Sequence, residues 1–197
     1  MNRRLFLATT LASGFAALSP ALAVAQSDDT VARAFVQRIS DDVVSMIRNP
    51  GGKAAQRAEF VALMDRYTNM RQLAGFSLGR YQRTMPEAMK SRYVQAFGRF
   101  IAATYVDRFG EYAGETITVG GARRTSDGYL VETTINSGSQ PYTVLWDISD
   151  RSGEMRVEDF VMEGISMAQS QRSEFTSMID GYGGDLERFV QFLESRG

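Results

Sequence analysis

The chain has 197 residues, 44% of them hydrophobic and 23% charged, which fits one soluble globular domain or two small subdomains that share a core. It contains no His and no Cys, and this excludes Ser-His-Asp and Cys-His catalysis, thiolate or imidazole metal sites, and disulfide bonds. The net charge is −1 and the 22 basic residues are spread along the chain, so no nucleic-acid-binding surface is expected.

The first 25 residues have the composition of an export signal. Arg3 and Arg4 precede an uncharged run that ends in Ala23-Val24-Ala25, the small-x-small order that a signal peptidase cleaves. We therefore expect a signal peptide over residues 1–25 and one mature domain over residues 26–197. The adjacent arginines resemble a twin-arginine signal, and general secretory export stays open as the alternative. No later stretch approaches the roughly 18 apolar residues of a spanning helix, so no membrane anchor is expected.

Helical patterns open the mature chain. Apolar residues recur every three or four positions over residues 31–47, which predicts a first helix with its N-cap in Ser27–Asp29. A second helix is predicted over residues 53–67, followed by a helical segment over residues 69–84 that glycines interrupt.

A longer helix is predicted over residues 86–112, and its apolar side is rich in aromatic rings such as Tyr93, Phe97 and Tyr105. Two interpretations follow from this side. The rings belong to a filled core, or they leave gaps between them and line a pocket for an apolar ligand.

After the long helix, the spacing of apolar residues changes from every three or four positions to every second position. Four strands are predicted, at residues 116–119, 129–135, 142–148 and 155–162, with hairpin-length turns between them. Two further helices are predicted, one capped by Ser166 and the last one capped by Asp185. The order predicts an α+β domain with N-terminal helices, a four-stranded antiparallel sheet, C-terminal helices, and an apolar cavity between the sheet and the helices.

Candidate acids and bases are limited to Asp and Glu. Glu158, Asp159 and Glu163 lie on or beside the last predicted strand, but no spacing singles out a catalytic pair. The chain has no calcium loop and no phosphate-binding loop. We therefore predict a binding protein with no catalytic residues, no metal and no cofactor.

A family resemblance appears where the last strand meets the next helix. Asp159, Glu163-Gly164, Ser166 and Phe175 match the Trp-x-Val-Tyr-Asp-x-x-x-Glu-Gly-Val-Ser run and the following aromatic of the MlaC family, also called the toluene-tolerance family. Upstream, Leu78-Gly79-Arg80-Tyr81 resembles the Leu-Gly-x-Tyr-Trp segment of that family. The chain departs from the pattern by carrying Met155 for Trp, Glu158 for Tyr and Gln82 for Trp.

The resemblance implies a periplasmic lipid carrier. Such a protein is expected to act as a monomer that takes a phospholipid between an outer-membrane lipoprotein complex and the MCE-domain subunit of an inner-membrane ABC transporter. A branch associated with hopanoid synthesis is equally compatible, so a hopanoid or sterol-like ligand stays open. Two acyl tails require a cavity toward the top of the roughly 300–1,000 Å³ range.

Two other classes of function stay open. One is a small exported enzyme that acts on an apolar substrate, with Asp159 as a pocket carboxylate of raised pKa. The other is an interaction module whose apolar faces only dock partners.

The lipid-binding residues are expected between the sheet and the long aromatic helix. They share an apolar or aromatic character, and they are Leu73, Phe76, Tyr93, Phe97, Tyr105, Val131, Val144, Trp146, Val157 and Val161, with Ile165 at the rim. Arg80 and Arg172 flank the family-like segments, and at least one of them is predicted to meet the lipid phosphate at the pocket mouth.

Overall fold

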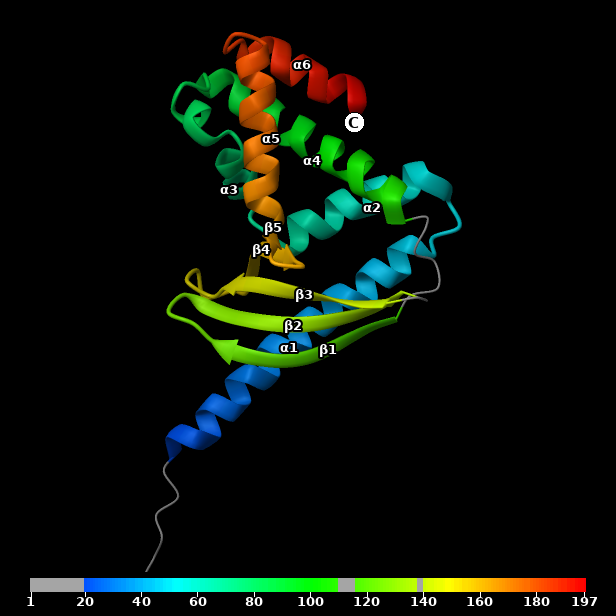
Figure 1. Ribbon diagram of the computed structural model, residues 1–197, viewed down its shortest axis with the longest axis vertical. Helices are drawn as coiled ribbons and strands as arrows, with labels where there is room; N and C mark the ends of the chain where they lie inside the picture. Colours follow the sequence, from blue (N-terminus) through cyan, green and yellow to red (C-terminus); the bar gives the residue numbers. More distant parts are fainter. Residues whose placement is uncertain (1–19, 110–115, 138–139) are drawn as a thin grey trace, which may run out of the picture.

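Six α-helices and one antiparallel sheet make up the part of the chain that the computed structural model describes, residues 20–109, 116–137 and 140–197 (Figure 1). Residues 1–19, which hold most of the predicted signal peptide, lie outside the described residues. Residues 110–112, the predicted end of the long helix, lie outside them too.

Helix α1 (Pro20–Ile47) crosses one face of the sheet and packs against β1 and β2 (Figure 1). It begins before the predicted cap at Ser27–Asp29, and that prediction is wrong. Pro20 is tolerated in a first turn, and the alanine-rich stretch that follows favours helix, so nothing stops the helix from starting early.

Helix α2 (Gly52–Tyr67) runs back along α1 and is tied to it at both ends. At its start, Gln56 Nε2 donates to the carbonyl of Ile47 at 2.7 Å. At its end, the Tyr67 hydroxyl donates to Asp42 Oδ2 at 2.7 Å. These bonds hold the two helices as one unit.

The predicted broken segment is α3 (Met70–Ser77) followed by the 3₁₀ turn η1 (Gly79–Arg83). The break falls at Gly79, whose φ of +54° is strained for residues that carry a Cβ. The long helix α4 (Glu87–Phe109) follows and packs on α2, α3 and α6.

The sheet has five strands in the order β1 (Thr116–Arg124), β2 (Gly128–Ser137), β3 (Gln140–Ser149), β4 (Arg156–Met162) and β5 (Ile165–Ser166). Four strands were expected, and the fifth exists because Glu163 and Gly164 both adopt positive φ, +50° and +81°. This tight reversal brings Ser166 back beside Val161.

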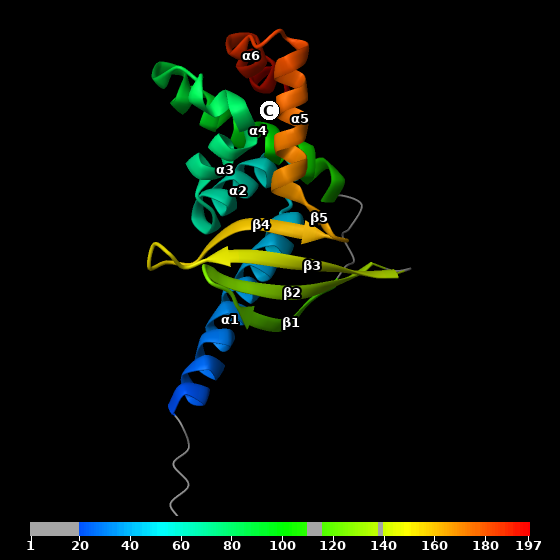
Figure 2. The same ribbon diagram turned by 60° about the vertical axis from the view of Figure 1, so that its left-hand side comes forward.

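Helix α5 (Met167–Gly181) rises from β5, and α6 (Leu186–Arg196) lies at the end of the molecule farthest from the sheet (Figures 1 and 2). Both predicted caps are confirmed. Ser166 Oγ accepts from Gln169 N at 3.0 Å, and Asp185 Oδ1 accepts from Arg188 N at 3.0 Å.

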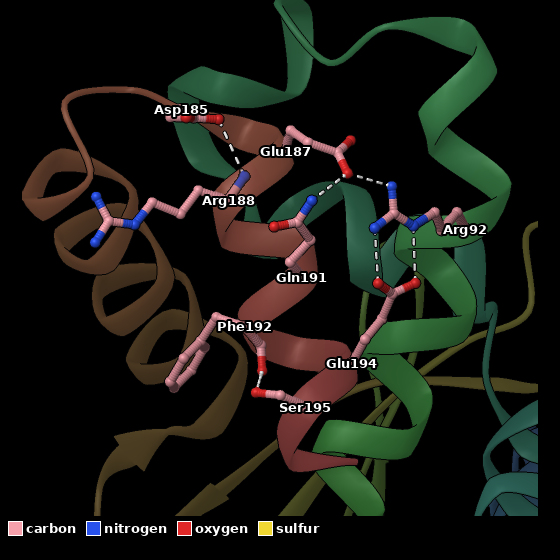
Figure 3. Close-up of polar contacts among 8 residues, drawn as sticks. All are labelled: Arg92, Asp185, Glu187, Arg188, Gln191, Phe192, Glu194 and Ser195. Atoms are coloured by element: carbon pink, nitrogen blue, oxygen red, sulfur yellow. Dashed lines mark hydrogen bonds and ion pairs between the residues drawn. The ribbon is translucent and has the colours of Figure 1, made fainter.

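An arginine joins α4 to α6 on the outside of the helical layer (Figure 3). Arg92 donates to Glu187 at 2.6 Å and to both oxygens of Glu194 at 2.8 and 2.7 Å. Gln191 also donates to Glu187, at 2.9 Å. These hydrogen bonds lower the pKa of both glutamates.

Buried residues form two main cores. The helical core lies between α3, α4, α5 and α6, and its fully buried rings include Tyr93, Phe175 and Phe189. The sheet core lies under α1, where Phe35 and Val36 meet Val131 and Ile148. The space between these two cores holds the candidate site.

Candidate functional site

A cavity of about 280 Å³ lies between the inner face of the sheet and the surrounding helices. Its walls are mostly apolar. The sheet contributes Ile117, Ile135, Tyr142, Val144, Trp146, Val157, Phe160 and Met162. The helices contribute Ile39, Val43, Ile47, Phe60, Leu63, Met64, Tyr67, Leu73, Phe76, Phe97, Ile101, Tyr105 and Met167. A cavity with walls of this kind suits an apolar ligand.

Strand alternation places the sheet residues. Val144 and Trp146 on β3 share one face because side chains two positions apart point the same way. The Trp146 indole N–H donates to the buried Thr133 hydroxyl at 3.0 Å, which satisfies the polar atom of the ring and fixes its orientation. Trp146 therefore forms a rigid wall of the cavity.

Helix α1 supplies the facing wall through Ile39, Val43 and Ile47, which recur every four residues along one side of the helix. Tyr67 closes this wall from α2, and burial raises the pKa of its hydroxyl, so Tyr67 is neutral at physiological pH.

The cavity has an acidic end beside the start of α5, where Glu158 and Asp159 join its lining. Asp159 accepts from the backbone N–H groups of Phe160 at 2.8 Å and Ala168 at 2.9 Å, and from the Ser166 hydroxyl at 2.5 Å. Both carboxylate oxygens thus hold the corner between β4 and α5. On the neighbouring strand, burial and the charges of Glu158 and Asp159 raise the pKa of Asp147.

Seven of the eleven expected apolar residues line the cavity: Leu73, Phe76, Phe97, Tyr105, Val144, Trp146 and Val157. The structure brings them together from α3, α4, β3 and β4, as expected for a cavity between the sheet and the long helix. Their contact with a lipid stays a prediction.

Four expected residues lie outside the lining. Tyr93 is packed in the helical core, where its hydroxyl hydrogen-bonds Ser77 at 2.7 Å. Val131 is fully buried under α1 in the sheet core. Val161 alternates with the lining residue Phe160 and so lies on the opposite face of β4. Ile165, in β5, is 60% exposed.

The two expected head-group arginines also lie outside the lining. Arg80 is exposed and forms an ion pair with Asp180, which also accepts a hydrogen bond from Tyr81. The exposed Arg172 lies with its guanidinium 5.0 Å from the ring centre of Phe76, so it touches the outer side of a cavity wall. A phosphate contact by either residue stays a prediction.

Sequence reasoning missed the contribution of α1 and α2. Val43, Ile47, Phe60 and Met64 fit helical stripes, which predict burial without separating a filled interface from a hollow one. It also missed Arg48, which lies just past the end of α1 and lines the cavity.

In residues 20–109, 116–137 and 140–197, no helix is both long enough and apolar enough to cross a membrane. Over the same residues, no group of three acidic side chains gathers as a metal site.

Comparisons with known proteins agree with this architecture. The model of the MlaC protein family matches residues 37–195. The intermembrane phospholipid transport system binding protein MlaC of Haemophilus influenzae is 21% identical over 161 residues, covering 76% of this chain and 75% of that relative. The solved structure of a phospholipid-binding protein from Ralstonia solanacearum, in complex with a phospholipid, shares the fold with a TM-score of 0.69. It is 19% identical, over 83% of this chain and 95% of that chain. Because the family match spans most of the sequence, this chain belongs to the MlaC family.

Proposed function

We propose that this protein is a periplasmic carrier that holds the acyl chains of a phospholipid in its cavity and moves the lipid between the two membranes. The observation that carries the proposal is the cavity itself, whose walls come from both the sheet and the helices and are mostly apolar. The names of the Haemophilus and Ralstonia relatives, which concern phospholipid transport and phospholipid binding, support the same ligand.

Water is the reason that a carrier is needed. Each methylene group that leaves water contributes about 0.8 kcal/mol, so two acyl chains cost tens of kcal/mol when they are released into water. Transfer between a bilayer and an apolar cavity is close to neutral, because both ends of the transfer are apolar.

The cavity volume sets a condition on loading. At about 280 Å³ the cavity is smaller than the upper-range volume expected for two tails, and the sequence-based expectation of size is wrong for this conformation. We infer that the walls separate as lipid enters. Met64, Met162 and Met167 line the cavity, and their flexible side chains repack readily around an irregular ligand.

The proposed partners are an outer-membrane lipoprotein complex and the MCE-domain subunit of an inner-membrane ABC transporter. The exposed Ile165, which begins β5 just after the β4–β5 turn, is our candidate for contact with them, because it is one of the few large apolar side chains on the described surface. The signal-peptide pattern in residues 1–25 supports export to the periplasm.

Native mass spectrometry of protein purified from cell envelopes tests the proposal. We expect a bound mass of several hundred daltons that chloroform extracts, and analysis of the extract distinguishes a phospholipid from a hopanoid. Delipidated protein mixed with phospholipid vesicles is expected to regain that mass. An empty protein that takes up no lipid from vesicles contradicts the carrier function.

A further inference from the structure

Arg48 combines two properties within the cavity lining. Among the described residues that line the cavity, it is the one basic side chain and the one exposed residue. Its position just after α1 places it where the apolar interior meets solvent. An exposed guanidinium beside an apolar cavity suits a ligand with an apolar body and an anionic head.

The backbone that carries Arg48 is held firmly. Gln56 Nε2 donates to the carbonyl of Ile47 at 2.7 Å, and the Asn49 side chain accepts from Gly51 N at 2.8 Å. The turn between α1 and α2 is therefore fixed on both sides of Arg48. A ligand that binds Arg48 therefore has to order its side chain alone and not the backbone of the turn.

Other cations near this turn are already engaged. Lys53 donates to the carbonyl of Val106 at 2.7 Å, and Arg57 forms an ion pair with Asp107 at 2.7 Å. No described residue forms an ion pair with Arg48. Asp41 and Glu59 border an adjoining hollow together with Arg48, and Glu59 accepts from Asn49 at 2.8 Å. Arg48 is thus the cation available at this opening.

The acidic end of the cavity lies at the other end of α2. Thr68, just past α2, bridges Val157 on β4, next to Glu158 and Asp159. A 16-residue helix is about 24 Å long, so Arg48 and these carboxylates mark opposite ends. An anionic head group is repelled from the acidic end and attracted to Arg48.

We propose that Arg48 binds the phosphodiester of the carried lipid at the cavity mouth, with the acyl chains extending inward past Ile47 and Tyr105. The inference rests on the proposed carrier function and deepens it by naming the head-group contact. The guanidinium is suited to this role because its planar fork donates two parallel hydrogen bonds to phosphate oxygens.

The test uses Trp146, the single tryptophan of the chain, which lies in the cavity wall. Lipids with brominated acyl chains quench its fluorescence when they enter. Two probes with the same chains are titrated in detergent, phosphatidylglycerol and diacylglycerol, of which only the first carries a phosphate. Arg48→Ala and Arg48→Lys are compared with Arg33→Ala, which removes an exposed charge elsewhere on α1.

We expect Arg48→Ala to weaken phosphatidylglycerol binding about fivefold and to leave diacylglycerol binding unchanged, because an exposed charge-assisted contact is of modest strength. Arg48→Lys keeps the charge but lacks the planar fork, so its affinity for phosphatidylglycerol is expected to lie between those of the wild type and Arg48→Ala. Arg33→Ala is expected to match the wild type. Inorganic phosphate in excess should not displace the lipid, since it lacks the apolar anchor.

Each contrary result has a distinct meaning. Equal losses for both probes assign Arg48 to the cavity shape and overturn the inference. If Arg48→Ala binds phosphatidylglycerol as the wild type does and Arg172→Ala or Arg80→Ala binds it more weakly, the phosphate contact belongs to one of those arginines. That result also overturns the inference. Displacement by inorganic phosphate alone indicates a free-anion site and also overturns it. A wild-type protein that neither probe quenches contradicts the carrier function itself.

Discussion

The helical core and the cavity are built from the same kinds of residue, yet one is solid and the other hollow. In the helical core, Phe175 packs edge-on to Phe189 with ring centres 5.0 Å apart and meets Phe97 at 6.1 Å. In the cavity wall, Trp146 has Phe160 beside it on the next strand at 6.0 Å, and its inner face borders open space.

The difference lies in the distance between layers. Helix α3 contacts α4 and α5, and α6 contacts α4 and α5. Large rings from these helices therefore interdigitate, as Phe175 does with Phe97 and Phe189. Beside the sheet, α1 packs on β1 and β2 and against α2, and the cavity lies in the space that remains between the sheet and helices α2 and α4. Where the gap between two layers is about as wide as a ring, aromatic side chains fill it. Where the gap is wider, they only line it.

The largest expected difference between the helical core and the cavity wall is in the stability lost when an aromatic ring is removed. Phe175→Ala in the helical core should destabilise the fold by ~3–5 kcal/mol, since it leaves a void among fully buried neighbours. Phe160→Ala in the cavity wall should cost only ~1–2 kcal/mol, because its ring is half-buried and faces a space that already exists. Urea unfolding followed by circular dichroism measures both. Equal losses would show that the cavity is packed in solution.

Adding a ring is the complementary test, and the inner face of the sheet offers a matched pair. Val131→Trp overfills the solid sheet core under α1 and should destabilise by ~1–3 kcal/mol. Val144→Trp enlarges a side chain in the cavity wall, so the fold should persist while bound lipid falls. Thermal unfolding and lipid extraction are measured on both variants. If Val144→Trp unfolds without losing lipid, the cavity is not the binding site.

Acid should weaken the helical core through Arg92. The pKa of Glu187 and of Glu194 lies below the ordinary value of 4.5, so their contribution to stability is present above that pH and is lost as pH falls through the lowered pKa. Arg92→Met should therefore lower the melting temperature at pH 7, and the difference from the wild type should shrink toward pH 3. A difference that is the same at both pH values would assign the effect to the arginine stem instead.

The smallest effect on stability is expected at the rim. Ile165→Glu should change the free energy of unfolding by less than ~0.5 kcal/mol, because the side chain is 60% exposed and belongs to neither core. Lipid occupancy should stay at the wild-type level while transfer to partner-containing membranes falls. Val31→Glu, at an apolar side chain that is 53% exposed on α1, is the control. Cooperative unfolding of Ile165→Glu at a much lower temperature would place Ile165 in a core.

Local signals in the sequence were sufficient for most elements. The caps Ser166 and Asp185 act on amides within three residues, so no distant contact is needed to place them. The alternation of β2 and β3 likewise predicted which side chains share the inner face. The start of α1 is an exception, since the helix begins at Pro20 whereas a cap was predicted at Ser27–Asp29.

The candidate site was likewise predictable from the sequence only in part. Sequence alone determined that the chain is α+β and that it lacks the residues for most catalysis. It also predicted eleven apolar positions around one cavity, of which seven line it. It could not separate Tyr93 from Phe97, which lie one helical turn apart on the same aromatic side of α4. Only the tertiary structure decided that Tyr93 lies wholly in the filled helical core, that Phe97 borders both that core and the cavity, and that the exposed Arg48 joins the cavity lining. The physical reason is that side-chain periodicity reports which face is buried, whereas the spacing between packed layers decides whether that burial leaves room for a ligand.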